Sequence, residues 1–481
     1  MNKTLISFCA GLILALTGCH RSLINLEKER IDHMIQDQDF LYHCAPLDNV
    51  LKLTLDEAIE LALKKNLDIM VAWQQFEVQQ EALFHQRWFM LPRLDLEALS
   101  SWRNKNTAAT SKLVNFPDIP QPYSISVDQR TKTSALTLSW NLLDFGVAYY
   151  RSRQEANSAL VKFFQYERTK QNIILEVTRQ FWRVAALQKG FKDAADWLVH
   201  VDEIVAKLDK YARDGRMSPI KVATFNSSVL DNKVRIEVFK PELLRATAEL
   251  QNLLGIPLEV EVELVGVDFT PEKIDLPPIA ELEELALLNR PELYGNDLEG
   301  HSIADSVRIA LLEVFPEIIP FIRHDYDANS FLLHHKWYTV GIRLATNLLG
   351  IPEKLQLARQ GQAQKLQNKY QRLQLSLAVL SQVHLAYTLY QEQLEFYRTY
   401  EQVLRNLEFV RKAAERMREL DAKGEMDIIQ AQAFAYQEQI NALNTYAQLA
   451  ASIEQLNNSM GLPGYLGSRS KQTNIEECEE D

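Results

Sequence analysis

The sequence is poor in residues that interrupt helices, and it has no long apolar segment. Its 481 residues include 16 Gly and 16 Pro, few for a chain of this length, and this scarcity favours long helices. No apolar run reaches about twenty residues, which argues against a protein that crosses a membrane with α-helices. A mean hydropathy of −0.21 agrees with this and is compatible with membrane β-strands.

Short motifs that carry common enzyme chemistry are also missing. The sequence has no GxGxxG or GxxxxGK[ST] loop, no HExxH and no CxxC pair. His324-Asp325 and His334-His335 are candidates for a metal site, but they fall at expected strand ends, where His is common. We therefore predict no enzyme, no metal site and no cofactor. The formal charge of −12 comes with no basic stripe, which argues against a nucleic-acid partner.

The first residues have the pattern of a secretory signal. Lys3 precedes an apolar run at 5–16, too short to span a membrane permanently, so residues 1–18 are predicted to be a signal peptide. The tetrapeptide Leu-Thr-Gly-Cys that ends at Cys19 resembles a bacterial lipobox, which implies lipidation of Cys19. The next residue is His20 and not Asp, which by resemblance implies sorting to the outer membrane. The alternative is a plain signal with an incidental Cys.

Both ends of the remaining chain are polar. Residues 19–50 form a mixed-charge arm with no clean period, and residues 464–481 form an acidic tail that is predicted to be disordered. Cys44 and Cys478 lie in these segments. They could pair in an oxidising periplasm or could stay free, and the sequence leaves both options open.

A capping box starts the first helix of the predicted folded region. Thr54 caps this helix and Glu57 reaches back to it, and the helix runs to Pro92. A second copy of the helix precedes Pro316 at a constant shift of 224 (316 − 92), and both copies contain Glu-Leu-Ala-Leu. The chain therefore divides into a first copy, a Val/Glu-rich linker and a second copy: residues 51–257, 258–278 and 279–463.

Each copy continues into two predicted strands. Apolar and small polar residues alternate strictly from Leu136 to Leu142, and the same strand-to-helix junction returns at Ile342, a shift of 206 (342 − 136). The loops between the strands, roughly 103–132 and 327–336, differ in length, which accounts for the change in shift. Aromatic residues near the strand ends are either a membrane-interface belt or ordinary strand aromatics: Trp102, Tyr123, Trp140, Tyr326, Trp337 and Tyr338.

Each copy ends in two long helices. Residues 147–214 contain no Pro, and at 1.5 Å per residue this helix is on the order of 100 Å long. The chain breaks at 215–219 and returns towards Pro257 with a kink at Pro241. The second copy repeats this plan with a break at 421–426. Apolar stripes at three- and four-residue spacing, among many small residues, predict helices packed side by side as coiled coils.

Four strands with one apolar face cannot form a closed barrel. Open sheet edges leave backbone groups unpaired in lipid, so a lipid-facing sheet has to close. About eight strands are already the small end for a barrel. We therefore expect a mainly α chain whose copies share a membrane β-barrel at one end and a long α-helical tube at the other.

The paired L-T-L-x-E-A-I-x-L-A-L helix, the strand-L-x-D-x-G-helix junction and the long hairpin resemble TolC-like outer-membrane efflux and secretion channels over residues 51–463. The resemblance implies a homotrimer with a 12-stranded β-barrel, four strands from each of three chains, and a periplasmic α-helical barrel. It implies the outer-membrane channel of a tripartite efflux system. Such a channel is a passive exit duct for substrates that an inner-membrane pump and a periplasmic adaptor deliver, and it contacts outer-membrane lipid.

The resemblance also implies which residues lie at the periplasmic mouth. Asp427 matches an Asp that lines the constriction in the family, and Lys221 (427 − 206) is its repeat partner. Lys221 of a neighbouring hairpin could pair with Asp427 and hold the mouth shut, or both could be solvated helix-end charges. The residues expected to contact the adaptor are Gly215, Arg216, Met217, Ser218, Lys423, Gly424 and Glu425.

Two other functions remain open at this point. Type I protein secretion uses the same kind of outer component as efflux, and the exported substrate is not written in this sequence. A structural coiled-coil lipoprotein of the envelope would need the helices but would have no use for four alternating strands at repeat-matched positions.

Overall fold

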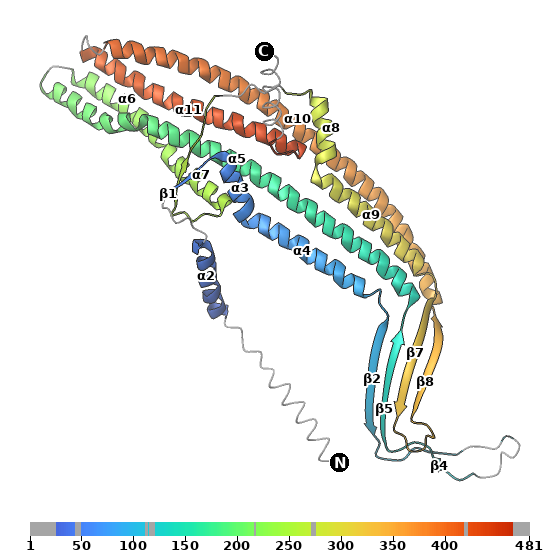
Figure 1. The fold of residues 1–481 in the computed structure, drawn as a ribbon. Coiled ribbons are helices and arrows are strands. Elements are labelled where there is room, and N and C mark those ends of the chain that lie inside the picture. The colour runs from blue at the N-terminus through green and yellow to red at the C-terminus, as the bar shows by residue number, and fades with distance from the viewer. Residues whose placement is uncertain are drawn as a thin grey trace, which may run out of the picture.

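The computed structural model describes residues 26–43, 50–110, 114, 121–215, 218–270, 276–417 and 422–464. Several expected features lie outside these residues: the signal peptide 1–18, Cys19, Cys44, Arg216, Met217, Asp421, Cys478 and the acidic tail. The described chain is elongated, with a β-sheet at one end and long helices that extend from it (Figure 1). Among the described residues, no helix combines the length and the apolar character needed to cross a membrane.

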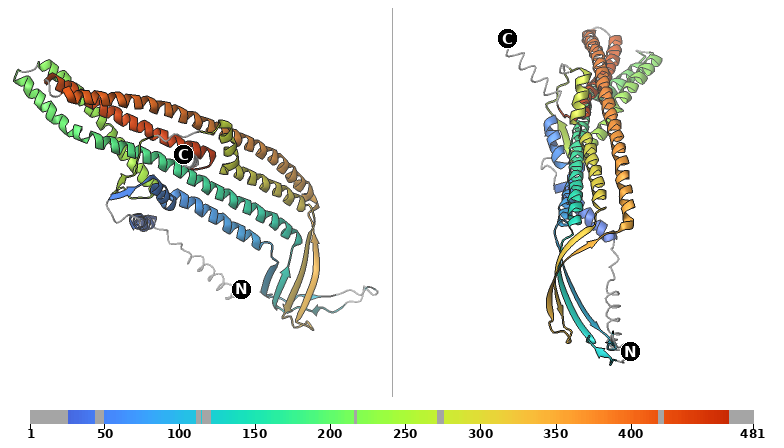
Figure 2. Two further views of the ribbon diagram at one scale, coloured as in Figure 1. Left: turned by 45° about the horizontal axis from the view of Figure 1, so that its top comes forward. Right: turned by 90° about the vertical axis from the view of Figure 1, so that its right-hand side faces the viewer.

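Four antiparallel strands form the sheet, in agreement with the four predicted from the alternation. Their order is β2-β5-β7-β8, so the strands of the two copies meet between β5 and β7. The sheet is curved along its length (Figure 2). A short hairpin of β3 (Ala108–Ala109) and β4 (Ser124–Ile125) lies in the first loop. The four strands are β2 (Arg93–Trp102), β5 (Arg130–Ser139), β7 (Glu317–Asp327) and β8 (Lys336–Ala345).

The helical segment before the first sheet strand of each copy is split in two, where the sequence predicted one helix. The Thr54 capping box is confirmed, with the Thr54 amide donating to Glu57 at 2.9 Å. The splits fall at Asn66 and Arg290, which are repeat partners (290 − 66 = 224), because both residues have extended backbones that end the preceding helix. The four helices are α3 (Leu55–Lys65), α4 (Leu67–Trp88), α8 (Ile279–Asn289) and α9 (Pro291–Leu312).

The long helices begin directly at the ends of β5 and β8. Asn141 caps α5 (Leu142–Arg213), and 72 residues at 1.5 Å each give about 108 Å. The second junction has no Asp-Gly, and there a 3₁₀ turn, η1 (Leu348–Gly350), leads into α10 (Ile351–Met417).

The return helices confirm one predicted interruption and shift another. α6 (Pro219–Glu237) and α7 (Phe239–Leu254) meet at Val238, three residues before the expected kink at Pro241. α10 ends at Met417 and α11 (Ala422–Met460) begins inside the break predicted at 421–426, since Ala, Lys and Glu are good helix formers and one Gly near a helix start is tolerated.

Side-by-side packing of the long helices replaces a single globular core, as the apolar stripes predicted. One buried cluster joins α5, α6 and α11 through residues that include Leu187, Val229 and Ile440. Another joins α8, α10 and α11 through Leu282, Val383 and Leu456. A third packs α3 and α7 on the middle of α5 around Phe181 and Leu254.

Two segments contain structure that the sequence patterns did not reveal. The N-terminal arm includes α2 (Leu26–His43). The predicted linker contains β6 (Glu261–Leu264), which pairs in parallel with β1 (Val50–Leu53). This short sheet joins the start of the first copy to the segment between the copies.

Candidate functional site

One face of the four-stranded sheet is apolar and exposed to solvent in the single chain. Leu94 lies opposite Leu138, Leu138 opposite Ile322, and Ile322 opposite Val340, so a row of aliphatic side chains crosses all four strands. Val340 is 74% exposed and Leu96 is also 74% exposed. An apolar surface this continuous is unusual on a soluble monomer and marks an interaction with lipid or protein.

The other face of the sheet carries polar and charged side chains. The Arg323 guanidinium donates to the Asp325 carboxylate at 2.7 Å, and Thr137 lies opposite Arg323 on the neighbouring strand. Arg93 pairs with Asp95 at 3.4 Å near the helical end of the sheet. The two faces therefore differ in the way that a barrel wall between lipid and a water-filled lumen requires.

Several of the predicted belt aromatics lie on the apolar face at its two ends. Trp102, Tyr326 and Tyr338 lie at the end near the loops, in register with the apolar rows. Trp140 lies at the helical end, where its indole nitrogen donates to the Met90 carbonyl at 3.1 Å. Aromatic rings at both edges of an apolar band are typical of membrane interfaces. Trp337 lies opposite Asp325 on the polar face, so it is not part of the belt.

The first helix tip contains the turn that the sequence predicted. Gly215 has a φ of +71°, a left-handed conformation that favours Gly, and no heavy atom lies within 4 Å of the position its Cβ would occupy. Ser218 precedes α6, and its side chain makes no capping hydrogen bond. Lys221 lies in the first turn of α6 and is exposed.

The second tip is described at its backbone. Lys423, Gly424, Glu425 and Asp427 belong to the first turns of α11, and their side chains lie outside the described part of the structure. Packing between α6 and α11 puts the tip with Lys221 beside the helix that carries Asp427. The place of Lys221 and Asp427 at a channel mouth, and the ion pair between them, stay predictions.

A buried charge network holds the end of α11 against the α8–α9 junction. Arg290 is 3% exposed, and it pairs with the Glu292 carboxylate through two nitrogens at 3.1 Å. The same guanidinium donates to the Asn458 and Ser459 carbonyls at 3.3 and 3.2 Å. These carbonyls are at the negative end of the α11 dipole, which a cation stabilises.

A second arginine reaches the same place from α5. Arg168 contacts the Glu292 carboxylate at 2.8 Å and the Asn458 carbonyl at 3.0 Å. Burial lowers the pKa of Arg168 to about 10, the positive charge of Arg290 acts in the same direction, and Glu292 opposes both. One carboxylate and one helix terminus thus join α5, α9 and α11.

The first copy has an equivalent junction with different chemistry. Asn66, the repeat partner of Arg290, donates to the Leu253 carbonyl at 3.0 Å, and Leu253 is the repeat partner of Ser459 (459 − 206). Asn66 also caps α4 through the amides of Asp68 and Ile69. Each copy therefore docks the end of its return helix on the split before its sheet, with a neutral amide in one copy and an ionic network in the other.

The C-terminal caps of these return helices require glycine. Gly461 has a φ of +76°, and a Cβ there would lie 2.9 Å from the Asn289 carbonyl oxygen. Gly461→Ala should therefore lower the melting temperature more than Gly464→Ala. Gly464 has a similar φ of +72° but no heavy atom within 4 Å of a Cβ, so its substitution costs only the backbone strain, about 1 kcal/mol. Thermal unfolding of both purified variants tests this, and equal melting temperatures would contradict it.

The linker between the copies is fixed to the helices by aromatic residues. The Tyr397 hydroxyl donates to the Phe269 carbonyl at 3.2 Å, and the Tyr446 hydroxyl donates to the Thr270 carbonyl at 3.1 Å. The Trp182 ring of α5 packs against the Phe269 ring of the linker at 6.0 Å between centroids. Burial raises the pKa of Tyr397, so the phenol stays protonated and can keep donating its hydrogen bond. The linker is thereby tied to α5, α10 and α11.

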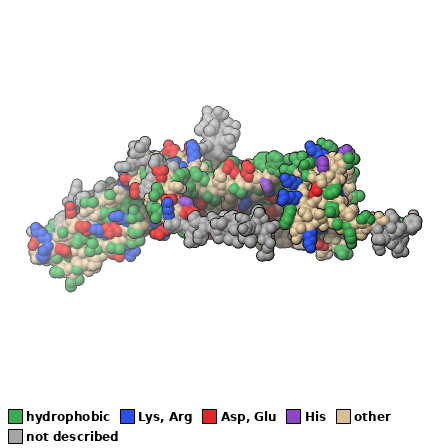
Figure 3. Space-filling view, turned by 90° about the horizontal axis from the view of Figure 1, so that it is seen from below, with side chains coloured by type: hydrophobic (Ala, Val, Ile, Leu, Met, Phe, Trp, Pro, Cys, Tyr) green, Lys and Arg blue, Asp and Glu red, His purple; other side chains and the backbone are tan. Residues whose placement is uncertain are grey.

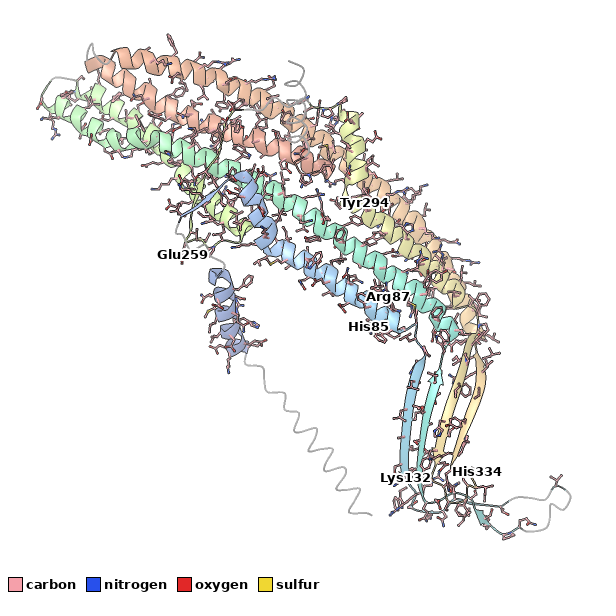
Figure 4. The ribbon with its side chains drawn as sticks, in the orientation of Figure 1. His85, Arg87, Lys132, Glu259, Tyr294 and His334 are labelled. Atoms are coloured by element: carbon pink, nitrogen blue, oxygen red, sulfur yellow. The ribbon has the colours of Figure 1, made fainter. Side chains whose placement is uncertain are left out.

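Within the part of the chain that the structure describes, no group of three or more His, Cys, Asp or Glu could hold a metal ion. The His335 imidazole contacts the Asp327 carbonyl at 3.0 Å, and His324 packs on the Tyr338 ring at 4.8 Å. Both histidines therefore have structural contacts at the loop end of the sheet (Figure 4, where His334 marks this end).

Comparison with known proteins agrees with this geometry. Residues 58–256 match the model of a family described as outer membrane efflux protein. No curated protein matches the sequence. Several solved structures are similar over most of their length, and at their levels of identity the likeness is one of fold.

Three of these structures illustrate the likeness. The Campylobacter jejuni CmeC outer membrane channel has a TM-score of 0.66 and 13% identity, over 87% of this chain and 88% of that chain. The Vibrio cholerae outer membrane protein VceC has a TM-score of 0.66 and 14% identity, over 85% and 96% of the two chains. The open state of the Neisseria gonorrhoeae MtrE outer membrane channel has a TM-score of 0.64 and 15% identity, over 85% and 89%.

Proposed function

We propose that this chain, whose residues 58–256 match the outer membrane efflux protein family, forms with two further copies the exit duct of a tripartite efflux system. The three sheets would close into one barrel in the outer membrane, and the long helices would form a tube in the periplasm. An inner-membrane pump and a periplasmic adaptor would deliver the substrate to this tube. The chain would supply a path and no catalysis.

The open sheet is the observation that carries this proposal. In the described structure β2 and β8 each pair on one side only, so both edges present unpaired backbone groups. The apolar face belongs in lipid, and backbone groups at an open edge cannot be left unpaired there. Closure with strands of other copies satisfies the edges and keeps the polar face on the inside. A coiled-coil envelope lipoprotein would have no role for such a sheet.

Assembly and conduction test this proposal directly. The purified protein in mild detergent should be a trimer by light scattering, should resist dissociation in unheated gels, and should conduct ions in planar bilayers. A monodisperse monomer without conductance would refute the proposal. Cross-linking in cells, followed by identification of the pump and adaptor that co-purify, separates efflux from type I protein secretion.

The lipid anchor at Cys19 is a separate part of the proposal. Its support is the lipobox at 16–19. Cys19→Ala should leave unprocessed precursor and remove palmitate labelling, whereas Cys9→Ala should change neither. Processing and labelling that persist in Cys19→Ala would show that the residue is an ordinary part of a signal peptide.

The mouth of the tube is the proposed place of ion selection and gating. Three Asp427 carboxylates near the axis would attract cations, and Lys221 from a neighbouring hairpin would hold the mouth closed. Asp427→Ala should reduce cation preference, and Lys221→Ala should raise the open probability in single-channel recordings. A partly exposed pair contributes about 1 kcal/mol or less, so the rise should be about five-fold or smaller. Unchanged selectivity and gating in both variants would leave both residues as solvated charges.

A further inference from the structure

The apolar face of the sheet carries basic residues at its loop end and none at its helical end. In β5, Leu136 and Leu138 lie on the apolar face. Lys132 and Arg130 lie on the same face nearer the loops, and both are exposed. In β8 the corresponding end residue is Lys336, opposite Tyr326. Lys132 is labelled at the loop end of the sheet in Figure 4. A view from below shows Lys and Arg side chains beside hydrophobic ones on this part of the molecule (Figure 3).

These three cations have no protein partner among the residues that the structure describes. No hydrogen bond or ion pair joins the side chains of Arg130, Lys132 or Lys336 to another described group. The nearest carboxylates along the chain are occupied. Asp128 accepts from the Ser330 amide at 2.7 Å and from the Ser330 hydroxyl at 2.9 Å, and Asp327 accepts from the Asn329 amide at 2.9 Å.

Acidic side chains of the sheet lie on its other face. Asp325 pairs with Arg323, which also lies on that face. Glu97 lies opposite the buried Ala135, so it too is on the polar side. At the helical end, the apolar face finishes without charge in Leu94, Leu138, Ile318 and Leu344. Positive charge on the apolar face of the four strands is therefore confined to the loop end.

The spacing along β8 puts Lys336 at the level of lipid headgroups, and Lys132 and Arg130 lie farther toward the loops in β5. Lys336 and Leu344 are eight residues apart in one strand (344 − 336), and at 3.4 Å per residue this is about 27 Å. The apolar band of a membrane barrel is about 25 Å tall. Tyr338 lies between the aliphatic residues of β8 and Lys336, and Tyr326 lies opposite Lys336, where interface aromatics are expected.

We propose that Arg130, Lys132 and Lys336 bind phosphate-bearing lipid headgroups of the membrane leaflet on the loop side. This inference rests on the proposed function, which puts the apolar face in a bilayer. The three side chains would contact phosphate oxygens while their stems cover the edge of the apolar band. Because the helical end of the apolar face lacks charge, the preference for phosphate-bearing headgroups would act on one leaflet only. It would also fix the position of the barrel along the membrane normal.

Lipid enrichment around the whole protein tests the proposal. Wild-type protein is reconstituted in nanodiscs of phosphatidylcholine with a minor fraction of phosphatidic acid, and the lipids retained on release are quantified by native mass spectrometry. Each Lys or Arg near a membrane surface should favour binding of an anionic lipid about five-fold. Wild type should therefore enrich phosphatidic acid at least five-fold. The triple variant Arg130→Gln/Lys132→Gln/Lys336→Gln should lose this enrichment.

A matched triple variant controls for net charge. Arg93→Gln/Arg323→Gln/Arg343→Gln removes the same charge from the other face of the sheet and should enrich phosphatidic acid as wild type does. No enrichment by wild type, or equal enrichment by all three proteins, would overturn the proposal, as would equal loss in both triple variants. Trimer formation and conductance are measured on the same samples. Conducting trimers without enrichment refute only the lipid site, whereas a wild type that neither assembles nor conducts refutes the proposed function as well.

Discussion

Val340→Arg should sharply reduce assembly in the membrane, whereas Thr339→Arg, one residue away, should be tolerated. Val340 lies on the apolar face between Tyr338 and Leu344 and is 74% exposed in the single chain. An arginine at the midplane of a bilayer costs about 2–4 kcal/mol in a membrane barrel. In a trimer this cost occurs three times, which is enough to prevent insertion of most chains.

The control uses the alternation of the same strand. Thr339 points to the polar face, where it donates to Asp325 at 3.5 Å, so an arginine there would face the lumen. The amount of heat-modifiable oligomer in urea-washed membranes measures the effect. Equal amounts for the two variants would show that the apolar face does not contact lipid and would remove the main support for a shared barrel.

The sheet and the long helices were predictable because local patterns determine them. The alternation that starts at Leu136 predicted the two faces of β5, although the strand ends at Ser139 and Leu142 already belongs to α5. The scarcity of Gly and Pro predicted helices as long as α5. The break after α5 was predictable from Gly215 and Pro219, since a left-handed glycine and a helix-starting proline are both local signals. The second break had no such pair, and its expected position was displaced accordingly.

The helix-end junctions were not predictable, because their partners are distant in the chain and differ in kind between the copies. Asn66 contacts a carbonyl 187 residues away, and Arg290 contacts carbonyls 168 and 169 residues away. Comparison of the repeats gave no signal, since an amide occupies one position and a guanidinium the other. β6 was missed for a similar reason, because a strand of four residues can be recognised only from its pairing with β1.

Arg290→Met should destabilise the end of α11 more than any other single change at the helix junctions. The substitution keeps the apolar stem but leaves the Ser459 carbonyl without its guanidinium donor and Gln382 without the 2.9 Å bond that it accepts from Arg290. Removal of one partner from a buried ionic network costs about 3–5 kcal/mol. Arg168 would still contact Glu292, so the loss should lie at the lower end of this range.

Hydrogen exchange of the detergent-solubilised protein locates this effect. Amides in the last turns of α11 should exchange faster in Arg290→Met, and the apparent melting temperature should fall. Asn66→Ala is the matched control, because it removes the equivalent contact from the first copy together with a helix cap, at about 1 kcal/mol. Its effect should appear at the ends of α3 and α7 and should be smaller. If the two variants lose similar stability, the ionic network contributes no more than the neutral amide does. The buried charges would then serve to fix which helices meet at the second junction rather than how tightly they hold.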